Sequence, residues 1–247
     1  MPMPTAAPAT FQGFQPEAIQ FMADLAVNND RAWFQPRKAD FERLLKEPME
    51  ALVVAIAERF EARGIPLLAD PKRSPFRIYR DTRFSRDKSP YKTHYAATFP
   101  WLDAPPPDGS DLTRAERRAD DGAHGNGGYF NFQPGEMYMG GGMWMPDKSR
   151  LDAFRSAIVA DPGRVAAALE DPGFVAAFGE ARSHETLKRV PPGYPADHPM
   201  ADRLRWKDVI FGRRLGDKEV TSADLPDRLA DGYAAALPVF RFLATLR

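Results

Sequence analysis

The sequence predicts an α+β fold, in which an antiparallel sheet of about four or five strands is flanked by N-terminal and C-terminal helices. Three observations support this class. Apolar residues recur at helical spacing up to residue 64, short β-type segments follow one another between residues 76 and 140, and helix-start signals return after Pro146. Strands that follow one another without crossover helices pair in the antiparallel direction.

The N-terminal part contains the first helices. Residues 1–10 are rich in proline and alanine, so we expect them to be disordered. Pro16 suits the first position of a helix, and Asp30 suits the N-cap of the next one. Pro48 begins a long helix whose apolar residues repeat every three or four positions, and Gly64 ends it.

Four segments then have the pattern of strands, and they span residues 76–80, 95–101, 129–133 and 136–140. The last two are joined by Pro134-Gly135, which favours a type II turn and therefore a looser connection than the tightest hairpin. Residues 102–127 contain three consecutive prolines, many charged residues and few apolar ones. We expect this stretch to be a mobile surface loop.

Helix-start signals dominate the C-terminal part. Asp147 or Ser149 is expected to cap one helix, and Asp161 and Asp171 each directly precede a proline that suits a helix start. Asp224 starts a final helical segment that Pro238 interrupts.

A short helix or strand is expected over residues 200–211. Because the sequence contains no internal repeat, residues 11–247 are expected to form a single α+β domain.

Composition excludes several kinds of protein. The 247 residues carry 34 basic and 34 acidic side chains, so the net charge is zero and gives no long-range attraction to nucleic acid or membrane. There is no cysteine, which excludes disulfides and thiolate sites. The first residues lack the pattern of a secretory signal, and no apolar run is long enough to span a membrane. We therefore expect a cytoplasmic protein.

The densest charge lies between residues 72 and 94, where eight lysines and arginines stand against two aspartates, with aromatic residues among them. Guanidinium groups suit bidentate binding of carboxylate or phosphate. We therefore expect a basic pocket for a small anionic ligand. Its candidate binding residues are Arg77, Arg80, Arg83, Lys88, Tyr91 and Lys92.

Four residues of the same region are candidates for proton transfer or catalysis. Asp81 and Asp87 could orient the arginines or move a proton, and Lys88 adds a point charge. His94 follows the basic run and titrates near neutral pH. Two carboxylates among so many cations make a poor metal site, so we expect neither a metal nor a cofactor.

Two other interpretations of the basic run stay open. The arginines and aspartates could form an internal salt-bridge network, in a structural or interaction protein without catalysis. The run could also bind nucleic acid, because basic and aromatic side chains alternate in it, although the zero net charge makes this partner the least favoured. The sequence does not indicate an oligomeric state.

The run itself resembles a family signature, Arg77-x-x-Arg80-Asp81-x-Arg83-Phe84-x-x-Asp87-Lys88-x-x-Tyr91. With Asn28-Asn29-Asp30, Gly140-Gly141-Gly142 and Pro192-Gly193-Tyr194, it is similar to domain of unknown function family 2461, a family of conserved hypothetical bacterial and fungal proteins. The resemblance extends over the whole chain. It implies that the 77–91 motif matters in the family, and it brings no activity and no catalytic residue. Residues 102–127 look longer than the family pattern, which argues against shared chemistry there.

Overall fold

The computed structural model describes residues 10–83, 85–102 and 125–246. Its helices are α1 (Pro16–Val27), α2 (Arg31–Phe34), α3 (Lys38–Phe41), α4 (Glu47–Arg63), α6 (Lys148–Ala160), α7 (Pro162–Leu169), α8 (Pro172–Phe178), α9 (Ala201–Leu204), α10 (Asp217–Val220), α11 (Leu225–Ala235) and α12 (Leu237–Ala244). A 3₁₀ turn, η1 (Gln35–Arg37), and a π turn, η2 (Glu42–Lys46), lie between α2 and α4. The strands are β1 (Tyr95–Pro100), β2 (Gly125–Phe132), β3 (Tyr138–Trp144) and β4 (Val209–Arg214).

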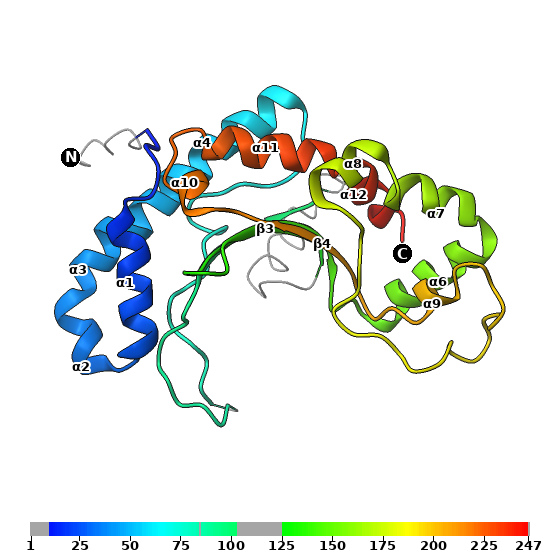
Figure 1. Cartoon of the computed structure of the whole chain (residues 1–247), viewed down its shortest axis with the longest axis horizontal. Helices are drawn as coiled ribbons and strands as arrows, with labels where there is room; N and C mark the ends of the chain where they lie inside the picture. The colour runs from blue at the N-terminus through cyan, green and yellow to red at the C-terminus, as the bar shows by residue number, and fades with distance from the viewer. Residues whose placement is uncertain (1–9, 84, 103–124, 247) are drawn as a thin grey trace, which may run out of the picture.

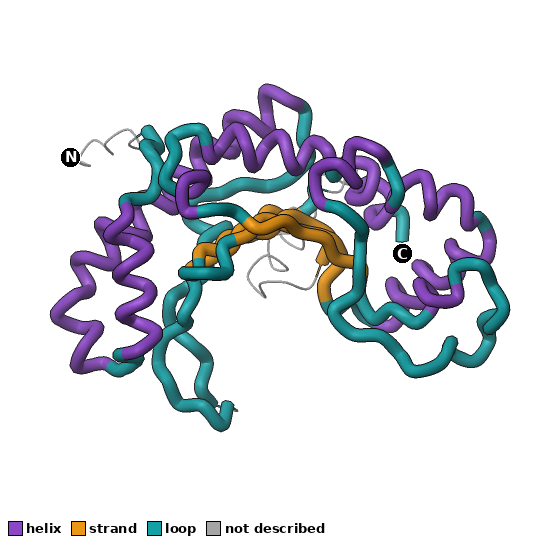
Figure 2. Tube along the Cα trace, in the orientation of Figure 1, coloured by secondary structure: helices purple, strands orange, loops and turns teal. Residues whose placement is uncertain are grey.

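The four strands form one antiparallel sheet in the order β1-β2-β3-β4. The sheet is curved, with α4 and α11 over its convex side (Figures 1 and 2). Helices α1 to α3 lie beyond one end of the sheet, and α6, α7 and α9 lie beyond the other (Figure 1). This arrangement confirms the expected α+β class, an antiparallel sheet flanked by N-terminal and C-terminal helices.

The helix boundaries follow the local signals that the sequence carries. Asp30 caps α2, because its carboxylate accepts a hydrogen bond of 2.8 Å from the Trp33 amide. Asp147, Asp161 and Asp171 cap α6, α7 and α8 in the same way. Gly64 ends α4 in the left-handed conformation, with φ of 62°.

The sheet differs from the expected one at three places. Residues 76–80 are not a sheet strand, and Tyr79 pairs with Tyr91 in an isolated bridge. The next pair is Arg80 and Pro90, and Pro90 lacks the amide hydrogen that would complete it. The fourth strand is β4, from the stretch for which helix and strand were both open. The expected loop 102–127 is shorter than predicted, because Gly125–Gly127 belong to β2; residues 103–124, and most of the expected disordered terminus, lie outside the described residues.

The turn between β2 and β3 is the looser connection that Pro134-Gly135 predicted. The Glu136 amide donates to the Gln133 carbonyl over 2.9 Å, and Gly135 has φ of 78°, as a type II turn requires. The strand expected over residues 136–140 is β3, which begins at Tyr138 and continues to Trp144, so Gly140–Gly142 lie inside it.

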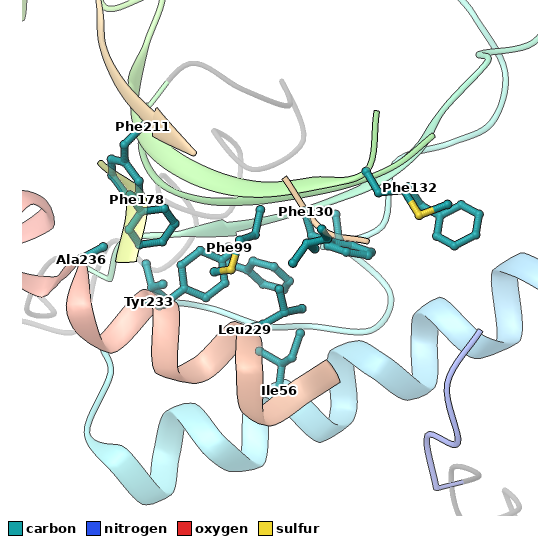
Figure 3. Packing of buried hydrophobic residues seen from close by; sticks show 14 of the residues in the cluster. Ile56, Phe99, Phe130, Phe132, Phe178, Phe211, Leu229, Tyr233 and Ala236 are labelled. Carbon is teal, nitrogen blue, oxygen red and sulfur yellow. The ribbon is translucent and has the colours of Figure 1, made fainter. Parts of the chain in front are cut away.

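The core lies between the convex side of the sheet and the helices that cover it. Phe99 of β1 and Phe130 of β2 pack toward Ile56 of α4 and Leu229 and Tyr233 of α11 (Figure 3). All five side chains are fully buried. None of the helices in the described part of the chain is both long and apolar enough to cross a membrane.

Candidate functional site

The basic run forms a projecting arm, which we define as residues 76–83 and 85–92. Its two sides run antiparallel: the Lys92 amide donates to the Ile78 carbonyl over 2.7 Å, and the Arg80 amide donates to the Pro90 carbonyl over 2.9 Å. The Phe76 amide donates to the Ala96 carbonyl, which ties the arm to β1. The arm extends away from the sheet alongside α1 and α2 (Figure 1).

The arm is attached to the α1–α2 turn by Asn29 and Phe34. The Asn29 carboxamide accepts a hydrogen bond from the Tyr91 amide and donates one to the Tyr91 carbonyl, each 3.0 Å long. The Tyr91 ring is buried and stacks on Phe34, with ring centroids 4.1 Å apart. Tyr91 is therefore a residue of the core as well as a predicted binding residue.

Sequence reasoning missed the role of Asn29. It stands within the Asn28-Asn29-Asp30 segment, which resembles the family pattern. However, its partner is 62 residues away in the chain, so no local signal shows the contact.

At the arm tip, residues 81–83 and 85–89, both aspartates form ion pairs within the arm. Arg80 pairs with Asp87, and Arg83 pairs with Asp81 through two nitrogens, the shorter contact being 2.6 Å. The Lys88 ammonium donates to the Thr82 carbonyl over 2.9 Å. Three of the predicted binding residues thus have partners inside the arm.

Both aspartates of the tip stay ionised far into the acid range. Hydrogen bonds from Arg83, first from its side chain and then from its backbone, lower the pKa of Asp81 from 3.8 to about 2. The hydroxyl and amide of Ser89, followed by the Arg80 guanidinium, hold the pKa of Asp87 well below its usual range. Both side chains are exposed, so these pairs stabilise the fold only slightly.

We call Arg77, Lys92 and the nearby His94 the arm base, and their electrostatic environment differs from that of the tip. The Lys92 ammonium lies over the Phe76 ring, 4.8 Å from its centroid. Burial, and then the positive charge of Arg77, lower the pKa of Lys92 below 10.5. Among the described residues, no carboxylate forms an ion pair with Arg77 or Lys92. The base therefore holds two adjacent positive charges without an ion pair in the described chain. Arg77 also contributes, as the smallest cause, to the lowered pKa of Asp81, but that carboxylate is already paired with Arg83.

His94 extends this base toward β1. Burial, followed by the positive charge of Lys92, lowers the pKa of His94 below 6.5. The imidazole is consequently neutral near pH 7, and it can accept a proton there.

A separate hollow of about 370 Å³ lies between α2 and the arm, and Arg80 and Tyr91 are the predicted binding residues that line it. Arg31 and Gln35 complete it from the helix side. Arg77, Arg83, Lys88 and Lys92 do not line this hollow. The structure therefore divides the predicted residues among the hollow, the tip and the base, and it does not bring them all together.

Comparison with known proteins gives a family. A model of the conserved hypothetical protein family DUF2461 matches residues 17–242. The chain belongs to the DUF2461 family. No curated protein matches the chain, and no solved structure matches it either. The matched range covers α2, the arm and the sheet, and the family description names no activity.

The glycine run of this DUF2461 chain has a structural explanation. Gly142 adopts φ of 119°, and a Cβ there would lie 2.1 Å from the Val209 carbonyl oxygen of β4. The run thus lets β4 approach β3 closely. Within residues 10–83, 85–102 and 125–246, no group of three or more histidine, aspartate or glutamate residues is arranged to hold a metal ion.

Proposed function

We propose that this chain binds a small anionic ligand at the arm base, through Arg77 and Lys92. The observation that carries the proposal is the pair of adjacent positive charges that form no ion pair in the described chain, one of them on a partly buried lysine. The carboxylate that Arg77 influences, Asp81, is already paired with Arg83. A bound anion would remove the repulsion between the two cations and replace the water that burial takes from Lys92.

The charge of the base favours a phosphate-bearing ligand over a carboxylate. Two cations that form no ion pair in the described chain match the two negative charges that a phosphate monoester carries above its second pKa. A guanidinium offers a planar, two-pronged donor and an ammonium offers a point charge, and both are common partners of phosphate.

Among the four catalytic candidates, His94 has the environment that best fits proton transfer near neutral pH. Its pKa is lowered, so the imidazole is a free base there. Asp81 and Asp87 are held as carboxylates by hydrogen bonds within the tip, and Lys88 is engaged by the Thr82 carbonyl. These contacts support the structural interpretation for the tip, as a network that keeps the arm in shape.

Nucleic-acid binding is less well supported. The tip cations that would follow a phosphate backbone are largely occupied by the aspartates and a carbonyl of the arm. The net charge of zero adds no general attraction.

The test is calorimetric titration of the protein with inorganic phosphate at low ionic strength. We expect saturable binding that is weaker by about tenfold or more in Lys92→Met and in Arg77→Met, since a charged hydrogen bond contributes about 1.5–3 kcal/mol. Lys72→Met removes one exposed positive charge outside the arm and should leave the affinity unchanged. Equal affinities in all four proteins, or no binding of phosphate, would reject the proposal; circular dichroism checks that each variant is folded.

A further inference from the structure

The hollow between α2 and the arm has two walls of different origin. Arg31 and Gln35 are four residues apart, so they project from the same face of the α2–η1 segment. Tyr79, Arg80 and Thr82 face them from the arm. The two walls are more than 40 residues apart in the sequence, so the sequence did not predict that they form one pocket.

The backbone of the arm where it lines the hollow is held by contacts to the other side of the arm and to Asn29. Tyr79 pairs with Tyr91 across the arm, and Asn29 holds the Tyr91 backbone at both its polar groups. The hollow is therefore formed before any ligand binds, which limits the entropy lost on binding.

The side chains that line the hollow carry one positive charge that no ion pair compensates in the described chain. Arg80 is matched by Asp87, whose lowered pKa keeps it ionised at neutral pH. Arg31 is exposed and forms no ion pair with any described residue. Its guanidinium is thus free to bind one monoanionic group in bidentate fashion, and a carboxylate has that charge and shape.

The hollow also offers an aromatic surface. Tyr79 is 50% exposed, although its ring packs against Tyr91 with centroids 5.5 Å apart. Tyr91 in turn stacks on Phe34, so Tyr79 is the outermost ring of an ordered aromatic group. A half-exposed ring that is held in place this way can stack on a planar ligand at little entropic cost.

We propose that the hollow is a second ligand site, and that it binds an aromatic carboxylate. The carboxylate binds Arg31, the ring stacks on Tyr79, and Gln35 and Thr82 supply hydrogen bonds to polar substituents of the ring. The volume of about 370 Å³ falls in the range of small-molecule pockets, about 300–1,000 Å³. This site shares no residue with the arm base, and its ligand differs in charge and shape from the one proposed there.

The experiment uses benzoate as the probe, with the full chain, and follows binding by calorimetry or by ligand-observed NMR. We expect benzoate to bind more tightly than acetate, which lacks the ring. In Lys92→Met, in which the arm base is weakened, benzoate should bind at least as tightly as phenyl phosphate, which carries the wrong charge for the hollow. Arg31→Met should weaken benzoate binding by about tenfold. Tyr79→Ala should weaken benzoate binding and remove its advantage over acetate.

The matched control is Arg86→Met, which removes an exposed positive charge from the arm outside the hollow and should leave benzoate binding unchanged. Arg31 and Tyr79 are both exposed, so their variants are expected to fold, and thermal melting checks this. Absence of benzoate binding, or equal binding by Arg31→Met and the wild-type chain, would overturn the site. Tighter binding of phenyl phosphate than of benzoate in Lys92→Met would overturn its assignment to a carboxylate.

Discussion

At the scale of single residues, Lys92 and His94 have linked charges. The positive charge of Lys92 is the second cause, after burial, of the lowered pKa of His94. Removing that charge should raise the pKa of His94 toward 6.5, so we expect this shift in Lys92→Met. Adding inorganic phosphate to the wild-type chain should shift the pKa in the same direction, because a bound anion stabilises the imidazolium. NMR titration of the His94 ring measures both effects.

The same linkage gives a pH dependence of stability. The folded chain disfavours the imidazolium of His94, so the unfolded chain binds this proton more readily. The free energy of unfolding should therefore fall as the pH drops from about 6.5 through the lowered pKa of His94, and it should fall less in Lys92→Met. Lys72→Met is the control and should match the wild-type chain. A His94 pKa that responds neither to Lys92→Met nor to phosphate would show that the base does not act as one electrostatic unit.

At the scale of elements, the arm depends on one side chain of the α1–α2 turn. Asn29→Ala removes both hydrogen bonds to the Tyr91 backbone and leaves an amide and a carbonyl without a partner in a partly buried place. We expect the free energy of unfolding to fall by about 1–3 kcal/mol. Urea denaturation measures the change, with an unchanged slope if the loss is one of stability alone.

The neighbouring Asn28 provides the control for this prediction. Its carboxamide donates only to the Asp24 carbonyl at the exposed end of α1, so Asn28→Ala should change stability much less. Equal losses in the two variants would show that the arm does not depend on the contact between Asn29 and Tyr91.

The elements also show which features of the fold are local enough to predict from sequence. Pro16, Asp30, Pro48 and Asp161 mark helix starts because capping and proline geometry involve residues a few positions apart. Residues 76–80 have the composition of a strand, but whether such a segment joins a sheet depends on its partner, and here the partner is Pro90 and its neighbours.

The location of the candidate site could be predicted from the sequence, but which of its residues lie together could be predicted only in part. The charge density between residues 72 and 94 pointed to the arm. It could not separate Arg80 and Arg83, which form ion pairs with aspartates, from Arg77 and Lys92, which form none with a described residue. Arg31 was not a candidate, because its connection with Arg80 exists only once α2 packs beside the arm.

At the scale of the whole molecule, the sheet and the helices on its convex side are joined through Tyr233 of α11. Its hydroxyl donates to the Tyr129 carbonyl of β2 over 2.9 Å, and its ring is fully buried against Phe60 and Phe99. Salt bridges of Arg59 and Arg63 with Asp227 attach the same helix to α4. The sheet and the layer formed by α4 and α11 thus meet at the tightly packed Tyr233 ring.

This packing leaves no room for a side chain at Gly128 of β2. A Cβ at Gly128 would lie 2.7 Å from the Tyr233 ring, and the buried ring has no free space into which it could move. We expect Gly128→Ala to lower the free energy of unfolding by about 1–3 kcal/mol, through overpacking between the sheet and α11. Gly125→Ala in the same strand is the matched control, because a Cβ there meets no described atom within 4 Å. Thermal melting of both variants decides the point: a Gly128→Ala protein as stable as Gly125→Ala would mean that α11 can move away from the sheet without cost.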